Sequence, residues 1–371
     1  MFGLRRREHP MALLAVAIFI GAFVVSVIVT GLMRRFAPHF GLVDEPGERK
    51  VHTRTTPLGG GLGIFLGMAL PVAAGILTAW AVHAGWRPDW LPKEVLDEYG
   101  RVLGKGYVLA LIFGGALLIV VTGLFDDVKG LGPWLKLFVE VVVAVALIAC
   151  NISISIFIEN HWLCALVTLV WVVGITNAFN LLDNMDGLSG GVAFIVSAIF
   201  LVVAAQTHQF FIAALLLTLM GALAGFLVFN FPPASIFMGD SGSLFIGYML
   251  AVLSVLFTFY QESHALFPVV VPLLILAVPL FDTISVIVIR LHAGKSPFVG
   301  DKNHFSHRLV ALGMTPRETV LTIYLVTFCL GITATLLYQV NEMGAAIVFV
   351  QAFAILCVIL LLERAGRRKP P

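Results

Sequence analysis

Charged residues are scarce in this sequence of 371 residues. Asp, Glu, Lys and Arg make up only 12% of the chain, and hydrophobic residues make up 60%. Soluble globular proteins carry about 25% charged residues, so this composition excludes an ordinary water-soluble fold. The high hydrophobicity excludes a disordered chain, and a net charge of only +2 excludes a nucleic-acid-binding protein. The mean hydropathy of +1.01 instead predicts a protein with many membrane spans.

Cysteine is also rare. The four cysteines all lie in apolar runs, and no two of them form a C-x-x-C pair. This pattern excludes a disulfide framework and a structural zinc site. We expect reduced, buried cysteines that act as small hydrophobic residues. They are Cys150, Cys164, Cys329 and Cys357.

Long apolar runs predict an all-α polytopic membrane protein with about 11 transmembrane helices. We expect residues 1–371 to form a single integral-membrane domain. The first run follows three arginines, but it is too long for the apolar part of a signal peptide and no small-residue cleavage site ends it. It is therefore expected to be a retained helix. The predicted spans are 11–32, 59–84, 106–125, 134–158, 162–182, 188–207, 210–229, 242–260, 267–289, 318–338 and 344–362.

Basic residues are unevenly divided between the two faces that these spans define. Loops after odd-numbered spans, together with the C-terminal tail, carry 16 of the 23 lysines and arginines, and the opposite face carries 7. Because basic loops stay in the cytoplasm, the first face is predicted to be cytoplasmic. We expect a multi-pass protein of the cell (inner or plasma) membrane, with the C-terminus inside and the N-terminus outside. The arginines at 5–7 argue locally for the reverse orientation.

Five aspartates follow or precede spans on this predicted cytoplasmic face. Each could be a helix cap or a solvated loop residue, but caps need not gather on one face. Clustered carboxylates repel one another unless a cation lies among them. Oxygen ligands of this kind suit Mg²⁺, with Mn²⁺ as an alternative, and Mg²⁺ often binds one or two carboxylates plus substrate phosphates. The five are Asp126, Asp127, Asp183, Asp186 and Asp240.

The same face carries the cations that a phosphate-handling site needs. They occur in the first long loop, at Arg49, Lys50 and His52, and in the last, at Lys302, His304, His307 and Arg308. A P-loop is excluded, because Ile289 stands where its first glycine should be. The glycine-rich run at 59–67 has two interpretations: close helix packing, or backbone contact with a phosphate at a helix N-terminus.

Two further acids lie within predicted spans. Asp282 is costly there, and it either pairs with a base from the cytoplasmic side or caps a helix break at Pro279. Glu140 lies one turn after Lys136, so an i, i+4 ion pair between them is the simplest expectation.

Taken together, these motifs resemble those of the polyprenyl-phosphate N-acetylhexosamine-1-phosphate transferases. The resemblance covers almost the whole chain in family order, and the Arg-Lys-x-His pattern is similar to the N-acetylglucosamine branch. One position departs, since relatives often have His-x-His-His where this chain has Ser306. The matching blocks are GLVDEP at 41–46, RKVH at 49–52, PLGG at 57–60, GLFDD at 123–127, NAFNLLDNMDGL at 177–188, FMGDSGS at 237–243 and HFSHRL at 304–309.

The resemblance implies a reaction. A UDP-N-acetylhexosamine and a polyprenyl phosphate, most simply undecaprenyl phosphate, give a polyprenyl-diphospho-sugar and UMP with Mg²⁺, as the first membrane step of cell-envelope polysaccharide synthesis. A phosphate has a second pKa near 6, so the attacking lipid phosphate is mostly dianionic and a dedicated base is not required. Family members are often homodimers.

The resemblance also assigns roles. Asp240 is expected to bind the metal, with Asp127. Asp126 and Asp127 position the lipid phosphate or take its proton. Asn180, Asp183 and Asp186 line the nucleotide pocket, and Phe237 either stacks on uracil or anchors the chain at the membrane interface. His304, His307 and Arg308 hold the diphosphate and sugar, and Lys50 and His52 also contact substrate.

Two other classes of protein remain possible at this point. A cation-coupled secondary transporter would use carboxylates, but such sites lie at the bilayer midplane within repeated halves, and no repeat is visible. A scaffold subunit gives no reason for so many polar residues in short loops. The particular N-acetylhexosamine, the glycan pathway and the prenyl chain length are open.

Overall fold

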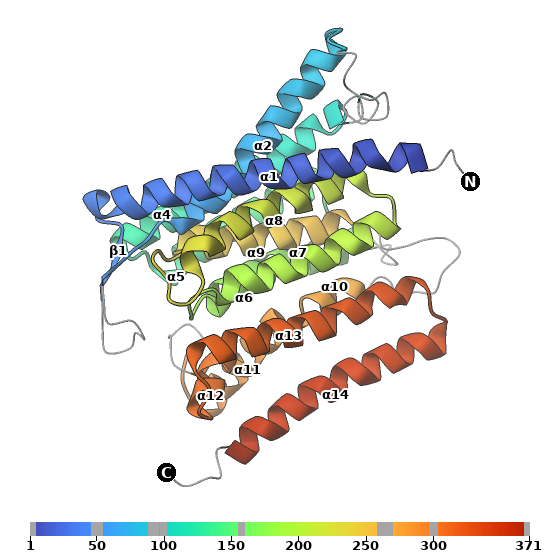
Figure 1. Ribbon diagram of the computed structural model, residues 1–371. Helices are drawn as coiled ribbons and strands as arrows, with labels where there is room; N and C mark the ends of the chain where they lie inside the picture. Colours follow the sequence, from blue (N-terminus) through green and yellow to red (C-terminus); the bar gives the residue numbers. More distant parts are fainter. Residues whose placement is uncertain are drawn as a thin grey trace.

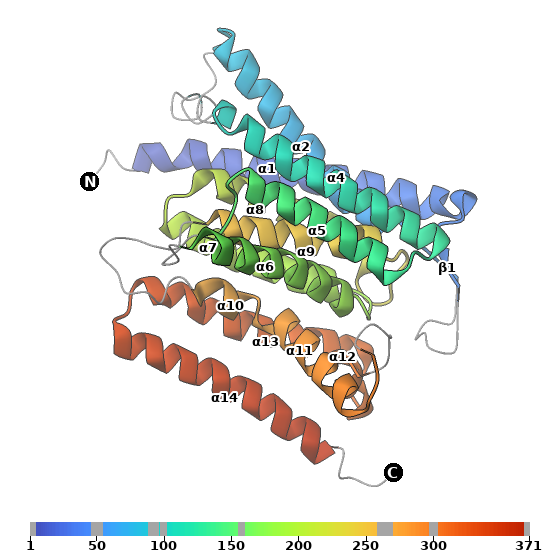
Figure 2. The ribbon, with the colours of Figure 1, turned by 180° about the vertical axis from the view of Figure 1, so that it is seen from behind.

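The computed structural model describes residues 5–45, 55–87, 96, 102–154, 160–257, 270–296 and 303–366. Nearly all of this is helix, and the helices lie roughly side by side (Figure 1). The first helix begins at the end of the molecule opposite to the end where the last helix stops, as Figures 1 and 2 show.

Eight helices of the described chain are long and apolar enough to cross a membrane. The predicted all-α polytopic class is therefore confirmed. Each of the eight corresponds to a predicted span within a few residues, apart from α1, which starts earlier. They are α1 (Arg5–Phe36), α2 (Gly60–His83), α4 (Gly106–Lys129), α6 (His161–Leu182), α7 (Leu188–Gln206), α8 (Phe210–Asn230), α13 (Pro316–Ala334) with η3 (Thr335–Tyr338), and α14 (Glu342–Gly366).

Three predicted spans are shorter or broken in the structure. Helix α5 (Pro133–Ala149) and helix α9 (Asp240–Leu256) have 17 residues each. The ninth predicted span is divided into α10 (Val271–Ile275) and α11 (Ala277–His292). The division falls at Leu276, because Pro279 cannot donate a backbone hydrogen bond to the carbonyl of Ile275. The count of about eleven spans stays a prediction.

Helix α9 is the centre of the fold. Fourteen of its residues, from Ser241 to Ser254, are buried, and it packs against α2, α4, α6 and α7. Figure 2 shows α9 surrounded by these helices, with α1 and α8 beyond them. A helix that is apolar on every side must be enclosed by other helices, so α9 holds its first residue, Asp240, in a fixed place.

The last third of the chain forms a separate layer of helices. Helix α11 packs against α6, and α13 packs against α7, while the short helix α12 (Phe305–Ala311) packs against α13. Helix α14 lies on the outer side of this layer, with few contacts other than those to α13 (Figure 1). The layer therefore brings α12 to the same end of the molecule as the start of α9.

The first long loop contains a small antiparallel ribbon. Strand β1 (Val43–Asp44) pairs with β2 (Thr56–Pro57), with Val43 opposite Pro57. A backbone hydrogen bond of 2.9 Å from Phe237 N to Pro57 O joins the ribbon to the segment before α9. The predicted substrate residues Lys50 and His52 lie outside the described residues.

The glycine-rich run serves close helix packing. A Cβ on Gly61 would lie 2.2 Å from Gly242 N of α9, and one on Gly63 would lie 2.0 Å from Thr30 Oγ1 of α1. The first amides of α2, at Gly60 and Gly61, donate to the carbonyls of Phe237 and Met238 at 3.0 Å each. The packing interpretation is therefore confirmed, and these two amides are already used within the fold.

The cysteines are all free thiols, as expected. Cys164 is buried, and Cys329 and Cys357 are partly buried. The expectation of burial is wrong for Cys150, which is exposed. The reason is that α5 ends at Ala149, earlier than the apolar run suggests, so Cys150 follows the helix instead of lying inside it.

Candidate active site

Lys136 connects two of the predicted site carboxylates. Its ammonium nitrogen lies 3.0 Å from Asp126 Oδ2 and 2.5 Å from Asp240 Oδ2. Asp126 is near the end of α4, Lys136 is in the first turn of α5, and Asp240 begins α9. Three helices thus meet at one cation, which reduces the repulsion between the two carboxylates.

Asp127 uses its carboxylate to cap the helix that carries Asp240. Its Oδ1 accepts from Asp240 N at 2.8 Å, and its Oδ2 accepts from Ser241 N at 3.4 Å. This contact needs a very close approach, because a Cβ on Gly123 would lie 2.4 Å from Ser241 Cα. Gly239 has φ of +71°, and a side chain there would also strike the Asp127 carboxylate.

Asn180 orients Asp240 from the other side. Its Nδ2 donates to Asp240 Oδ1 at 3.0 Å and approaches Ser243 Oγ at 3.0 Å. Both carboxylate oxygens of Asp240 therefore have donors, Lys136 on one and Asn180 on the other. Asn180 was predicted to line the nucleotide pocket, and the structure places it against the predicted metal ligand.

Asp183 and Asp186 lie in the short loop between α6 and α7. Burial raises the pKa of Asp183 to about 8, and the charges of Asp240, Asp127 and Asp186 act in the same direction. Asp186 Oδ2 accepts from Ala234 N at 2.9 Å, which ties this loop to the segment before α9. The structure thus brings all five predicted aspartates to one end of the helices.

Glu140 does not pair with Lys136, so that prediction is wrong. Lys136 turns to Asp126 and Asp240, while Glu140 Oε2 accepts from Asn177 Nδ2 of α6. The other oxygen of Glu140, Oε1, is buried and has no hydrogen-bond partner within the described part of the chain. Two carboxylates outside the helix compete for the ammonium group more strongly than one local neighbour does.

Helix α12 brings the predicted histidines beside the loop that holds Asp183. Ser306 Oγ donates to Asn184 Oδ1, so the departure from the His-x-His-His pattern makes a contact of its own. His304 Nδ1 lies 2.9 Å from Asp282 Oδ2. Of the two interpretations of Asp282, pairing with a base is the one observed. The His304 and His307 rings are in edge contact, with centroids 6.2 Å apart.

Arg308 is held by partners within its own layer. Its Nε donates to Glu363 Oε1 of α14 at 3.0 Å, and its two terminal nitrogens donate to Asn303 O at 2.6 Å and Ser285 Oγ at 3.0 Å. Only 6% of Arg308 is exposed. Arg308 thus links α11, α12 and α14. Its predicted contact with a diphosphate stays a prediction.

Comparison with known proteins bears on this arrangement. The model of glycosyl transferase family 4 matches residues 109–258, from α4 to the end of α9. The chain is 34% identical over 357 residues to a Bacillus subtilis protein named as a probable undecaprenyl-phosphate N-acetylglucosaminyl 1-phosphate transferase, covering 94% of this chain and 90% of that one. This chain belongs to glycosyl transferase family 4. The family resemblance predicted from the motifs is confirmed.

Two other named proteins are similar to this chain over nearly the same length. A Mycolicibacterium smegmatis decaprenyl-phosphate N-acetylglucosaminephosphotransferase is 32% identical, over 93% of this chain and 88% of its own. A Yersinia pestis undecaprenyl-phosphate α-N-acetylglucosaminyl 1-phosphate transferase is 27% identical, over 91% and 87%. The similarity therefore extends beyond α4–α9 to the layer that carries α12.

The donor groups of this glycosyl transferase suit a hard divalent cation. Carboxylate oxygens predominate, and the buried Oδ1 of Asp126 has no hydrogen-bond partner in the described chain. No group of three or more His, Cys, Asp or Glu side chains among the described residues is arranged to hold a metal by itself. Mg²⁺ does not require such a group, since it commonly takes one or two carboxylates, waters and substrate phosphates.

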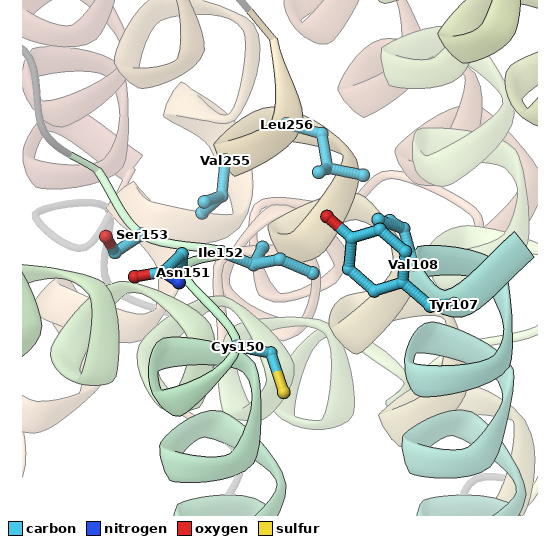
Figure 3. Close-up of a pocket in the computed structure, with 8 residues that line it drawn as sticks. All are labelled: Tyr107, Val108, Cys150, Asn151, Ile152, Ser153, Val255 and Leu256. Carbon is cyan, nitrogen blue, oxygen red and sulfur yellow. The ribbon is translucent and has the colours of Figure 1, made fainter. Parts of the chain in front are cut away.

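A cavity of about 520 Å³ lies at the opposite ends of the same helices. It is lined by residues at the start of α4, after the end of α5 and at the end of α9, as Figure 3 shows. The site aspartates and Lys136 are at the end of α4 and at the starts of α5 and α9. This cavity is therefore separate from the carboxylate cluster. Its lining residues are Tyr107, Val108, Cys150, Asn151, Ile152, Ser153, Val255 and Leu256.

Sequence reasoning missed Lys136 as a member of the site. A signal was available: Lys136 follows the Gly-rich turn after Asp126 and Asp127, on the same predicted face. Asn184 was quoted in a motif but given no role, and its contact with Ser306 depends on two segments 122 residues apart. Glu363 had no signal, because nothing in a C-terminal helix indicates a partner in α12.

Proposed function

We propose that this chain transfers N-acetylglucosamine 1-phosphate from UDP-N-acetylglucosamine to undecaprenyl phosphate and releases UMP, as the first membrane step of a cell-envelope polysaccharide. The observation that carries the proposal is the meeting of Asp126 and Asp240 at Lys136, with Asp127 capping the helix of Asp240, at one end of a membrane protein. The names of these similar proteins support the same reaction.

The reaction joins two polyanions. An oxygen of the lipid phosphate attacks the phosphorus that carries the sugar, a new P–O bond forms, and the bond from that phosphorus to the oxygen of UMP breaks. The negative charge moves to the departing UMP phosphate. Catalysis of such a transfer is mainly positioning and electrostatic stabilisation. Lys136 is placed to stabilise negative charge, and Asn180 keeps Asp240 in one orientation.

We propose Mg²⁺ as the cofactor, with Mn²⁺ as a substitute. Asp240 would hold the cation, together with Asp127, whose carboxylate caps the N-terminus of α9 beside Asp240. A bound divalent cation neutralises phosphate oxygens and organises the two reactants. Asp127 fixes the backbone of Asp240 through the hydrogen bond from Asp240 N. Asp126 and Lys136 are placed to orient the lipid phosphate.

We further propose that this end of the molecule faces the cytoplasm of the cell membrane, with the C-terminus inside and the N-terminus outside, because the spans predicted from the sequence assign 16 of the 23 lysines and arginines to that side. A single catalytic domain over residues 1–371 and a homodimer stay predictions. The transporter alternative is not supported, since the carboxylates gather at helix ends and not at the midplane that transporters use.

The test is an assay with purified protein, radiolabelled UDP-N-acetylglucosamine and undecaprenyl phosphate in detergent. We expect a butanol-extractable radioactive lipid and equimolar UMP with MgCl₂, and neither product in EDTA. UDP-N-acetylgalactosamine in parallel tests the sugar. The Glu318→Gln protein is the matched control, because Glu318 caps α13 with Thr315 and is exposed. Absence of both products, while an active relative works in the same mixture, would overturn the proposal.

A further inference from the structure

We propose that Asp282 is a positioning residue for this reaction: it fixes the ring of His304 and the start of α12 with one carboxylate. The inference rests on the proposed function and on the expectation from the family motifs that His304 helps to hold the diphosphate. It concerns the part of the molecule that the carboxylate cluster does not include, and it explains why an acid stands within the ninth predicted span.

Asp282 is almost completely enclosed. It lies in α11, and only 1% of it is exposed. An ionisable group in a membrane helix is costly to bury and is kept where it has polar partners and a function. Both oxygens of Asp282 have partners: Oδ2 meets His304 Nδ1 at 2.9 Å, and Oδ1 accepts from Phe305 N at 2.6 Å. The carboxylate is therefore satisfied entirely by two consecutive residues.

The contact with Phe305 replaces a missing helix cap. The N-cap residue of α12 is His304, and its side chain makes no capping hydrogen bond. Asp282 supplies the acceptor from another helix instead, and its negative charge is favourable at a helix N-terminus. The adjacent ring of Phe281 meets Phe305 edge to face, with centroids 5.7 Å apart. Asp282 and Phe281 thus both contact Phe305, the first residue of α12, and fix its position.

The contact with His304 determines which ring nitrogen remains for a substrate. An ionised carboxylate can only accept a hydrogen bond, so Nδ1 of His304 carries a proton. The ring makes no other hydrogen bond within the described chain. Nε2 is therefore the nitrogen left to meet a phosphate oxygen or a proton. A carboxylate in this position selects both the tautomer and the direction of the ring.

The fixed histidine is connected to the carboxylate cluster. Ser306, two residues after His304, donates to Asn184, and Asn184 follows Asp183 in the α6–α7 loop. The chain of contacts runs from Asp282 through the start of α12 to the loop beside Asp240. Asp282 therefore sets the position of one substrate-binding element relative to the other.

The alternative to be excluded is that Asp282 only caps α12 and has no effect on His304. The variant Asp282→Asn separates the two roles. Its amide oxygen can still accept a hydrogen bond from Phe305 N, whereas the NH₂ group that replaces the second oxygen cannot accept one from His304 Nδ1. We expect kcat to fall about ten- to a hundred-fold, by analogy with the loss of a carboxylate that orients a metal-binding histidine. KM for polyprenyl phosphate should change less than about twofold. Glu318→Gln, another helix-capping acid, is the control.

A double-mutant cycle provides the decisive measurement. If Asp282 acts through His304, then Asp282→Asn causes no further loss of kcat in a His304→Ala protein. Equal losses in both backgrounds, or normal kcat in His304→Ala beside a defective Asp282→Asn, would overturn the inference. Normal kinetics of Asp282→Asn would overturn it too, whereas no product from the wild-type protein would overturn the proposed function.

A second measurement does not depend on the folding of any Asp282 variant. Ring-¹⁵N-histidine spectra of the wild-type protein should show a protonated Nδ1 for His304, assigned by the signal lost in His304→Gln. An unprotonated Nδ1 beside a protonated Nε2 would contradict the proposed hydrogen bond. This measurement requires no turnover, so it tests the inference separately from the reaction.

Discussion

Two aspartates in different regions of the molecule cap helices to which they do not belong. Asp127 of α4 accepts from the first amides of α9, and Asp282 of α11 accepts from the first amide of α12. The second oxygen of Asp127 takes another backbone amide, while that of Asp282 takes an imidazole. In both regions one carboxylate fixes the start of a helix. Asp127 fixes the start of α9, which carries Asp240, and Asp282 fixes the start of α12 and also contacts the ring of His304 directly.

The ion pairs of these two regions differ in burial. Lys136, Asp126 and Asp240 have side chains that are 20%, 14% and 26% exposed. The side chains of His304 and Asp282 are only 6% and 2% exposed, and those of Arg308 and Glu363 are 5% and 8% exposed. Partly exposed charges can change partners when a ligand arrives, while buried pairs are costly to open. The ion pairs of the α4–α5–α9 region are thus suited to rearranging around a ligand, and those of the α11–α12–α14 region to holding His304 and α12 in a fixed geometry.

The largest loss of activity is expected in the first region, from Asp240→Asn. It removes a charge that meets Lys136 but keeps the shape of the side chain and the contact with Asn180. Turnover should fall by at least about 10²-fold, as for loss of a major electrostatic group, and the dependence on Mg²⁺ should weaken. Initial rates over a series of MgCl₂ concentrations measure both. Near-normal kinetics would remove Asp240 from the site and with it the contrast between the regions.

A smaller loss is expected from Lys136→Met. The substitution leaves Asp126 and Asp240 facing each other without their shared ammonium group. Loss of hydrogen bonds between charged groups costs about 1.5–3 kcal/mol, so kcat/KM should fall about ten- to a hundred-fold. The control is Lys129→Met, since Lys129 is exposed and lies over the Phe125 ring. Equal activity of the two variants would show that the ion pairs of Lys136 are not needed for the reaction.

The smallest effect on activity is expected in the second region, from Glu363→Gln. Arg308 would then keep a buried charge without its acidic partner, so the unfolding free energy should drop by about 3 kcal/mol. Activity at low temperature should change less than about threefold, because neither residue belongs to the carboxylate cluster. Thermal unfolding in detergent, with rates measured well below the midpoint, separates the two. Loss of activity without loss of stability would place Arg308 at the substrate after all.

The helical layout was largely predictable, because an apolar run of sufficient length has few options other than a membrane helix. Runs such as 162–182 and 188–207 agree closely with α6 and α7. The position of the helix break at Leu276 was not predicted, since Pro279 indicates that a helix is interrupted but not at which residue. The early end of α5 was also missed, because apolar residues continue past Ala149.

The site was predictable in its residues and less so in its contacts. Asp126, Asp127 and Asp240 were found because acids at span ends are unusual. The predicted partner of Lys136 was wrong because its i, i+4 spacing favoured Glu140, whereas the observed partner Asp240 lies 104 residues away in sequence. Long-range pairs of this kind depend on how helices pack, which spacing alone does not determine. For Asp282 the sequence left two interpretations open, a pair with a base or a cap at a break near Pro279, and neither of them identified the cap on α12.

The shortness of α9 has a consequence for the lipid carrier. Seventeen residues rise about 26 Å, less than the roughly 30 Å thickness of the hydrocarbon layer. Encased by longer neighbours, such a helix ends below the level of the surrounding headgroups when its far end reaches the opposite boundary. In the proposed reaction, the lipid phosphate would then reach the carboxylate cluster from below the headgroups, while its isoprenoid tail stays among the acyl chains.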